Sequence, residues 1–503
     1  MTAAYAILVI GCVVASGYVV AHRILPGIAR RVLALAGARV HVSPLMAKRI
    51  RRFKSIRRGY YAFLLVTSLF TASLFLELLV NDEALVIHRR GRTAFPAVRE
   101  WAGKWVPVVS IPHFLPGDEW GLPDQGRIDY RRYDARGVAD RIAAEQRARD
   151  EASARFEAMA RPVALKPPEP PPEPPAGASQ AAREQHEFDL ELYEIELADF
   201  RTNYEKVRGD HERRVLEYEF LERDLGAREG IIATLRELHA EMERGESWVV
   251  MPFYPYGPEE HILDIGGDPP YEPGQGGLLL GATDNGKDVF VQLAYGFRLS
   301  ILFAMLVAAV GETVGTLYGG IMGYYGGMID IGMQRFVEIW QSIPFLFTLM
   351  IIASIIQPGV IKLALLLIVL RAWLGITYTI RGEFYREKAK DYVQAAIAMG
   401  ASDWKVITRH ILPNALVPLV SFAPFAIVGY ISVLVSLDYL GFGLPPGTPS
   451  WGYLLKQGHE YLISYPHLIV VPSIALAATL FCVVIIGESV REAFDPKVFS
   501  RLR

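Results

Sequence analysis

Apolar residues gather towards the two ends of this 503-residue chain, and charged residues fill the part between them. A helix needs ~20 mostly apolar residues to cross a bilayer. Runs of about this length occur at residues 3–21, 60–80, 299–319, 334–356, 361–380, 416–437 and 467–487. They predict an all-α polytopic membrane protein with six core spans and one extra N-terminal span.

Basic residues orient these spans. Residues 22–58 contain eleven Lys and Arg and no acidic residue, and the positive-inside rule places such a stretch in the cytoplasm. Alternation of the spans then places residues 81 to about 295 outside and residues 381–413 inside. The latter segment is also basic, so charge and threading agree.

The outer segment contains two charged helical patterns within residues 127–246. The second pattern carries an apolar stripe at three-to-four-residue spacing, formed by Phe188, Leu192, Ile195, Leu197, Phe200, Tyr204 and Val207. Between the two patterns lies KPPEPPPEPP, residues 166–175, a stiff polyproline II element. We expect a long antiparallel helical hairpin that extends away from the membrane. It is either a docking arm for a soluble external partner or a solvated, partly disordered insertion.

Residues 391–414, DYVQAAIAMGASDWKVITRHILPN, predict two short helices broken at one glycine. Asp391 suits an N-cap, and Gln394 three residues later would complete a capping box. Gly400 suits a left-handed C-terminal stop. Ala395 and Ala396 leave one face of the first helix nearly flat, as a helix that enters a groove on a soluble partner would. The alternative is an ordinary helix–turn–helix between two spans.

Composition limits the chemistry. The net charge of −2 and the absence of an aromatic-studded basic groove give no sign of nucleic-acid binding. Both cysteines, Cys12 and Cys482, lie in apolar runs, and the eleven histidines have no ligand spacing. GATDNGKD, residues 281–288, approaches a phosphate-binding loop but has Asp288 where Ser or Thr is needed. We expect no catalytic residue, no metal and no cofactor.

The 391–414 segment resembles the cytoplasmic coupling loop of bacterial ABC-importer permeases. That loop has the pattern EAA, three residues, Gly, nine residues, then I-x-L-P. The pattern is matched here by Ala395, Ala396, Gly400, Leu412 and Pro413. Gln394 stands in place of the Glu, and His410 in place of the Ile.

Further motifs resemble permeases of the oligopeptide/dipeptide import family, and are most similar to the second permease of microcin C-type peptide importers. These motifs are Leu280 to Val289, with Ala282 inserted, GYYGG at 323–327, SLDYLGFGLPP at 436–446 with TPSWG at 448–452, Gly487-Glu488, and RRGYYAF and ELLVND near the first core span. The resemblance covers about residues 44–115 and 278–500. The first forty residues and the hairpin depart from the pattern.

The resemblance implies a type I ABC-importer transmembrane domain in the bacterial inner membrane. It implies a permease subunit of a binding-protein-dependent importer for short peptides, energised by separate ATPase subunits. The expected partners are a second permease subunit in a heterodimer, cytoplasmic ATPase subunits, a periplasmic solute-binding protein, the peptide and membrane lipid.

Two charged residues, Glu312 and Arg371, fall inside predicted spans. A charge at the bilayer centre costs ~3 kcal/mol or more, so each should face a pore or a partner. Arg371 would meet a peptide carboxylate on a translocation path. A structural ion pair across subunits accounts for it equally well.

These inferences divide the chain into five parts. Residues 1–40 form an extra N-terminal membrane helix, residues 41–80 a basic cytoplasmic segment with the first core span, and residues 81–290 an external loop with the hairpin. Residues 291–490 form the ABC-importer transmembrane domain, whose coupling loop is 381–413, and residues 491–503 a cytoplasmic tail.

Two alternatives remain open, and a third lacks support in the sequence. A secondary transporter would need inverted repeats and intramembrane ion ligands, which the sequence does not display. An envelope scaffold would use the hairpin as its functional element and the spans as anchors. A permease for a non-peptide substrate, such as a nickel chelate, would share every motif above.

The orientation is directly testable with single cysteines. Ala178→Cys, in the proline-flanked segment, should react with a membrane-impermeant maleimide in intact cells whose outer envelope has been permeabilised. Ala401→Cys, in the basic loop, should react only after lysis. The reverse labelling would overturn the orientation.

Overall fold

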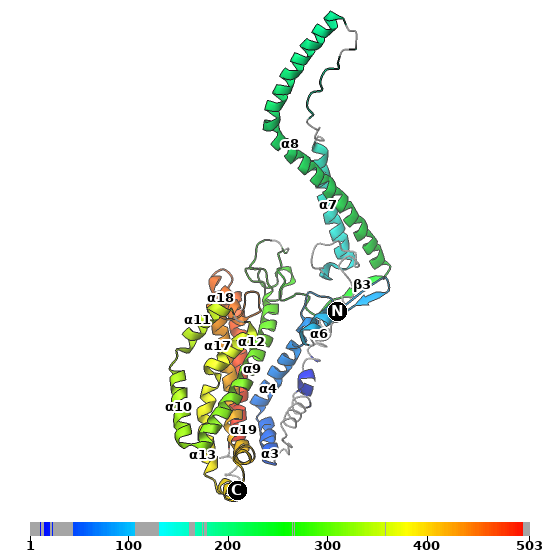
Figure 1. Cartoon of the computed structure of the whole chain (residues 1–503). Helices are drawn as coiled ribbons and strands as arrows, with labels where there is room; N and C mark the ends of the chain where they lie inside the picture. The colour runs from blue at the N-terminus through cyan, green and yellow to red at the C-terminus, as the bar shows by residue number, and fades with distance from the viewer. Residues whose placement is uncertain are drawn as a thin grey trace. The chain divides into compact units, whose positions relative to one another are not determined.

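The computed structural model describes residues 11, 15–20, 23, 44–105, 130–159, 166–173, 175, 179–263, 265, 267–357 and 359–495. The chain divides into two compact units, which we call the membrane unit (Met1–Asp82 and Pro252–Arg503) and the insertion unit (Glu83–Met251). Figure 1 shows the elements of both. Most of the span predicted at 3–21, the polar tail after 495 and Cys12 lie outside the described residues.

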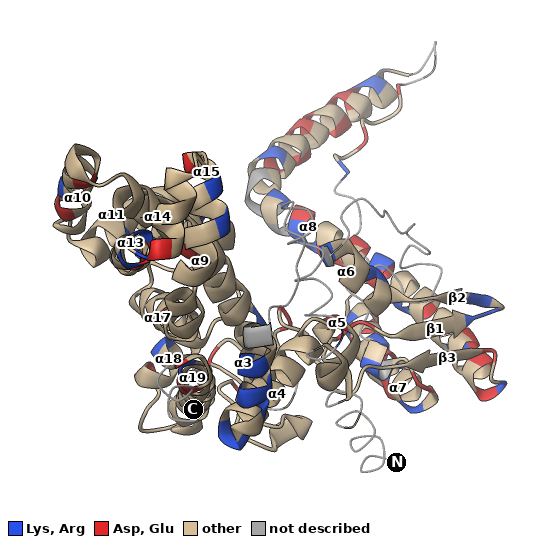
Figure 2. Ribbon diagram, turned by 90° about the horizontal axis from the view of Figure 1, so that it is seen from below, with Lys and Arg blue, Asp and Glu red and all other residues tan. Residues whose placement is uncertain are grey.

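The membrane unit is helical. Its helices are α3 (Pro44–Ser55), α4 (Arg57–Ser73), α5 (Leu76–Leu79), η4 (Gln275–Gly277), α9 (Val289–Tyr325), α10 (Gly327–Gln341), α11 (Phe345–Ile356), α12 (Val360–Leu367), η5 (Ile368–Ala372), α13 (Leu374–Lys388), α14 (Asp391–Ala398), α15 (Asp403–Lys405), η6 (Val406–Ile411), α16 (Leu412–Ala415), α17 (Val417–Leu440), α18 (Trp451–Glu460) and α19 (His467–Phe494). Blue patches on α3 mark its Lys and Arg residues (Figure 2), in the stretch expected to lie in the cytoplasm.

Among the described residues, three helices are long and apolar enough to cross a membrane: α9, α17 and α19. Two bent pairs raise the number to five if each pair is one span. They are α10 with α11, bent by 68°, and the helix at 360–372 with α13, bent by 46°. The five spans predicted between residues 299 and 487 fall on these helices.

The run at 60–80 is not one continuous helix. The 17-residue α4 ends at Ser73, and the four-residue α5 follows. Glu77 on α5 is fully buried and forms an ion pair with Arg298 on α9, at 2.9 Å. The expectation of a single 20-residue helix was therefore wrong at its C-terminal end.

The bends have local causes. Pro344 lies directly before α11, and proline has no N–H with which to continue the ladder from α10. The helix at 360–372 ends in η5, a stretch of π-helix that contains Arg371. Such stretches are rare and often occur at functional sites. Nothing in the apolar pattern predicted it.

The most extensive helix contact in the membrane unit joins α9 to the segment from η5 through α13. Four glycines spaced by four residues lie on this face of α9: Gly311, Gly315, Gly319 and Gly323. A Cβ on Gly315 would lie 2.4 Å from the carbonyl oxygen of Trp373, and one on Gly319 would lie 2.3 Å from that of Thr377. Only glycine lets two helix backbones approach this closely, as is common between helices in membranes.

Two apolar clusters pack the remaining helices around α9. One joins α9 to α11, α12 and α17 through Phe303, Leu349, Leu363 and Leu434. The other joins α9 to α17, α18 and α19 and includes Trp451, whose indole N–H donates to the carbonyl of Leu293 at 2.9 Å. The helix α9 is thus the central element of the unit.

The insertion unit contains a three-stranded antiparallel sheet, which the sequence analysis did not predict. Its strands are β1 (Val86–Arg89), β2 (Arg92–Ala94) and β3 (Ser247–Val250), in the order β2-β1-β3. Arg90 and Gly91 both have positive φ, which closes the two-residue turn from β1 to β2. The remaining elements are α6 (Pro96–Trp105), η3 (Tyr130–Arg132), α7 (Ala135–Ala158) and α8 (Gln180–Glu243).

Helices α7 and α8 form an antiparallel pair. Phe156 stacks on Tyr218 with ring centroids 4.7 Å apart, and Arg228 pairs with Glu145 at 3.0 Å. The 64-residue α8 continues well beyond this pair, and the stripe residues Phe188, Leu192 and Ile195 in its N-terminal part are exposed.

The N-terminal part of α7 and the C-terminal part of α8 pack with the sheet in a small apolar core. Val138, Leu235 and Leu238 pack against Ala84 and Ile87 beside the sheet. Arg89 on β1 and Arg90 both pair with the buried carboxylate of Glu241 on α8, at 2.7 and 2.5 Å. Burial opposes ionisation of Glu241, but hydrogen bonds from the two arginines outweigh it and lower the pKa.

The glycine contact predicts opposite effects of one substitution at two helical sites. Gly315→Ala should destabilise the membrane unit by ~1–3 kcal/mol, because its new methyl group forces two backbones apart. Gly332→Ala, on α10, is the matched control: no atom lies within 4 Å of its Cβ, so it should be neutral or stabilising. Thermal unfolding of the detergent-purified chain measures both. Equal effects at the two sites would contradict the close approach.

Candidate functional site

The predicted coupling loop forms two short helical segments around Gly400. Helix α14 ends at Ala398, Gly400 has φ +79°, and a second helical run comprises α15, η6 and α16. The left-handed stop at Gly400 is as predicted. Pro413 does not end the second run, which continues to Ala415.

The predicted capping box is absent. Lys390 occupies the N-cap of α14 without a side-chain cap, and Asp391 is the first residue inside the helix. The amide of Gln394 donates instead to the carbonyl of Lys388, at 2.7 Å. Only two residues separate α14 from α13, so the side-chain amide of Gln394 reaches the last turn of α13 and donates there, whereas in a capping box it would accept from the backbone N–H of Asp391.

The two alanines of the motif do not share a face. Ala396 is buried, as is Val393, which packs with Phe384 of α13 and Tyr324 of α9, whereas Ala395 is exposed. Adjacent helical residues point about 100° apart, so the pair cannot form one flat surface. The prediction of a flat alanine face was wrong.

The helices from α14 to α16 (residues 391–415) are called the coupling segment below. Polar contacts fix this segment to α13. The buried Glu387 accepts a hydrogen bond from the Tyr392 phenol at 2.7 Å and pairs with Lys390 at 2.6 Å. The amide of Asn414 donates to the same phenol oxygen at 3.0 Å. Burial and then the bond to Glu387 raise the pKa of Tyr392, which keeps its proton on the donor.

Two further contacts reach the ends of α9 and α10. The Tyr324 phenol donates to Asp403 at 2.7 Å. Arg381 on α13 donates through two nitrogens to the two carboxylate oxygens of Asp330 on α10, each at 2.6 Å. Such bidentate pairs fix geometry as well as charge. The coupling segment is therefore held directly to α13 and α9, and α13 is held in turn to α10.

The outer surface of the segment exposes two large apolar side chains, Met399 at 81% and Trp404 at 73%. Exposed residues of this kind are common anchors in protein interfaces. Asp391, Gln394, Ala395, Gly400 and Pro413 are also exposed, and His410 and Leu412 are half-buried. The sequence analysis did not single out Met399 or Trp404, although an exposed Trp next to the motif glycine was a usable signal.

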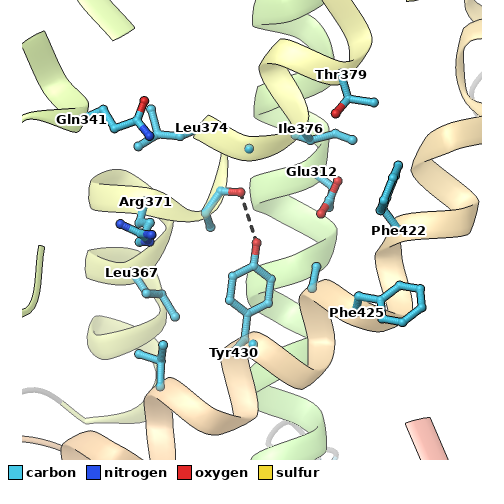
Figure 3. A pocket seen from close by; sticks show the side chains of 15 residues that line it. Glu312, Gln341, Leu367, Arg371, Leu374, Ile376, Thr379, Phe422, Phe425 and Tyr430 are labelled. Carbon is cyan, nitrogen blue, oxygen red and sulfur yellow. Dashed lines mark hydrogen bonds between the residues drawn. The ribbon is translucent and has the colours of Figure 1, made fainter. Parts of the chain in front are cut away.

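The two charged residues predicted inside spans line one pocket of about 490 Å3 (Figure 3). Glu312 comes from α9, Arg371 from η5, and Phe422, Phe425 and Tyr430 from α17. The Tyr430 hydroxyl donates a hydrogen bond to the carbonyl of Ala372 at 3.1 Å, and this bond joins α17 to η5 in the wall of the pocket. Gln341 and Thr379 are further polar lining residues that sequence reasoning missed, because separate helices bring them together.

The membrane unit thus combines candidate spans, two of them bent, with a pocket lined by two charged residues and a short helical segment after α13. The profile of the binding-protein-dependent transport system inner membrane component family matches residues 315–500. The chain is 42% identical over 218 residues to the peptidoglycan transport system permease protein YejE of Agrobacterium fabrum. This match covers 43% of the chain and 57% of that relative.

Two further relatives agree. The inner membrane ABC transporter permease protein YejE of Escherichia coli is 43% identical over 217 residues, which is 43% of this chain and 63% of the relative. The oligopeptide transport system permease protein OppC of Haemophilus influenzae is 36% identical over 223 residues, 44% of this chain and 71% of the relative. The match thus spans about three fifths of the length of the two YejE proteins.

The chain belongs to the family of binding-protein-dependent transport system inner membrane components. It is a multi-pass inner-membrane protein with a type I ABC-importer transmembrane domain, as the sequence analysis expected.

Proposed function

We propose that this chain is the permease subunit of an ABC importer that moves short peptides or peptide-like compounds across the inner membrane. The observation that carries the proposal is the coupling segment, a pair of short helices fixed to α9 and α13 that exposes Met399 and Trp404. Relatives named as oligopeptide and ABC transporter permeases support it.

Cytoplasmic ATPase subunits would receive the exposed face of α14 and α15. Closure of the ATPases on ATP would move this segment, and the Tyr392–Glu387 contact would pass the movement to α13. The glycine contact would move α9 with the segment from η5 through α13, so that Glu312 on α9 and Arg371 on η5 would move together. Alternating access then follows from one displacement of a rigid helix pair.

The remaining partners are a second permease subunit and an external solute-binding protein. We propose that the pocket with Glu312 and Arg371 lies on the translocation path and that the second permease completes its wall. The rival assignment is an ion pair from one of these residues to the second permease. The exposed stripe on α8 supports docking of the binding protein to the insertion unit.

The coupling proposal is tested at Gly400. In the reconstituted complex, Gly400→Val should uncouple ATP hydrolysis from uptake, because a β-branched residue resists positive φ at a cost of ~1–2 kcal/mol. Gly400→Asn should be milder, since Asn tolerates this conformation. Ala401→Val is the positional control. Import at the wild-type rate by Gly400→Val would remove the segment from the coupling role.

Docking is tested by trimming α8 rather than removing the whole hairpin. Deletion of 127–246 would strip the insertion-unit core of Tyr130, Val138 and Leu238, so the deletion is confined to 160–213. The trimmed chain should keep its ATPases and sister permease and bind the external protein more weakly in a pull-down.

A full-length control changes only three exposed residues of the stripe: Phe188→Ser with Leu192→Ser and Ile195→Ser. It should reproduce the docking defect. Normal docking by both variants would make the distal arm a dispensable insertion, and loss of the sister permease would make it part of the assembly interface.

A further inference from the structure

The pocket in the membrane unit contains one carboxylate and one guanidinium that do not pair with each other. Glu312 Oε2 is buried and has no hydrogen-bond partner among the described residues. The Tyr430 hydroxyl beside it is engaged, because it donates to the carbonyl of Ala372. Figure 3 shows Glu312 and Arg371 on opposite sides of Tyr430.

An unpaired carboxylate inside a membrane protein is costly. A buried charged group without a partner loses its hydration and gains nothing in return. Phe422, Phe425 and Ile376 in the pocket lining supply no donor, and the nearby Thr379 hydroxyl forms no hydrogen bond with Glu312 Oε2 (Figure 3). The Glu312 side of the pocket is therefore chemically incomplete until a cation or an N–H donor enters it.

Arg371 offers the opposite chemistry. Its guanidinium carbon lies 5.3 Å from the centroid of the Phe345 ring, so the guanidinium group packs over an aromatic ring. In the part of the chain that the structure describes, no carboxylate pairs with it. A guanidinium in this state keeps its planar fork available for a carboxylate, the group that this geometry suits best.

We propose that this pocket recognises a zwitterion, with Glu312 binding the ammonium group and Arg371 the carboxylate of the same short peptide. The proposal rests on the permease function and specifies its substrate class: peptides with both ends free. The volume of about 490 Å3 falls within the usual range of small-ligand sites. Leu367, Phe425 and Val433 supply apolar walls for the peptide side chains.

The experiment measures binding of labelled alanine peptides of two to five residues to the permease–ATPase complex in nanodiscs. The external binding protein is omitted, so that its own selectivity does not enter. The peptides are used free, N-acetylated and C-amidated. A charge-assisted hydrogen bond contributes ~1.5–3 kcal/mol, so blocking one end should weaken binding to the wild-type complex by on the order of tenfold or more.

Each charge should control one end of the peptide. Glu312→Gln should abolish the preference for the free over the acetylated peptide and retain the preference for the free acid over the amide. Arg371→Gln should do the converse. Glu338→Gln is the matched control, because this exposed carboxylate on α10 pairs with Arg335 and does not line the pocket.

Several outcomes would overturn the proposal. One is equal binding of free and blocked peptides by the wild-type complex. Another is loss of both preferences together in Glu312→Gln. Dissociation of the sister permease from Glu312→Gln or Arg371→Gln would assign that residue to an ion pair between subunits.

Uptake of the same peptides is measured in parallel in proteoliposomes with the binding protein present. No uptake by the wild-type complex would refute the peptide permease itself. Uptake without discrimination in the binding assay would refute only the pocket assignment.

Discussion

Four glycines on one face of α9 bring its backbone into contact with that of η5 and α13, and the rest of the membrane unit depends on this approach. The contact fixes the distance between the two helices that carry Glu312 and the Arg371 turn. It also continues to Gly323, one turn from the end of α9, where Tyr324 meets the coupling segment. Pocket and coupling segment are thereby attached to one rigid pair of helices.

The coupling segment shows how a surface motif is held in place by buried polar groups. Glu387 is almost wholly inaccessible, yet it contacts Lys390 and the Tyr392 phenol, and Asn414 closes the far side of the same phenol. Val393, Val406 and Ile411 complete the attachment from the apolar side. What remains on the surface is Met399, Gly400 and Trp404. Buried contacts therefore join this surface directly to α13.

The insertion unit is stabilised by different interactions. Its sheet and the base of α7 and α8 share a small apolar core, and Arg89 with Glu241 forms a buried ion pair inside it. The distal part of α8 has neither, and its stripe is exposed. The periodicity that predicted the long helix was correct because a stripe marks a helix whether or not a partner covers it. The strands escaped prediction because segments of three or four residues are too short to display a period of two.

The sequence by itself determined the membrane class, the central spans, the left-handed turn at Gly400 and the two charged residues inside spans. Each depends on local information: apolar run length, charge, or a conformation that one residue type favours. Tertiary structure alone decided the rest. Lys390 and not Asp391 caps α14, because α13 ends two residues earlier and its carbonyl of Lys388 takes Gln394. Glu312 and Arg371 share a pocket although 59 residues separate them in the sequence numbering (371 − 312), because four glycines that look unremarkable in an apolar run let α9 and α13 touch.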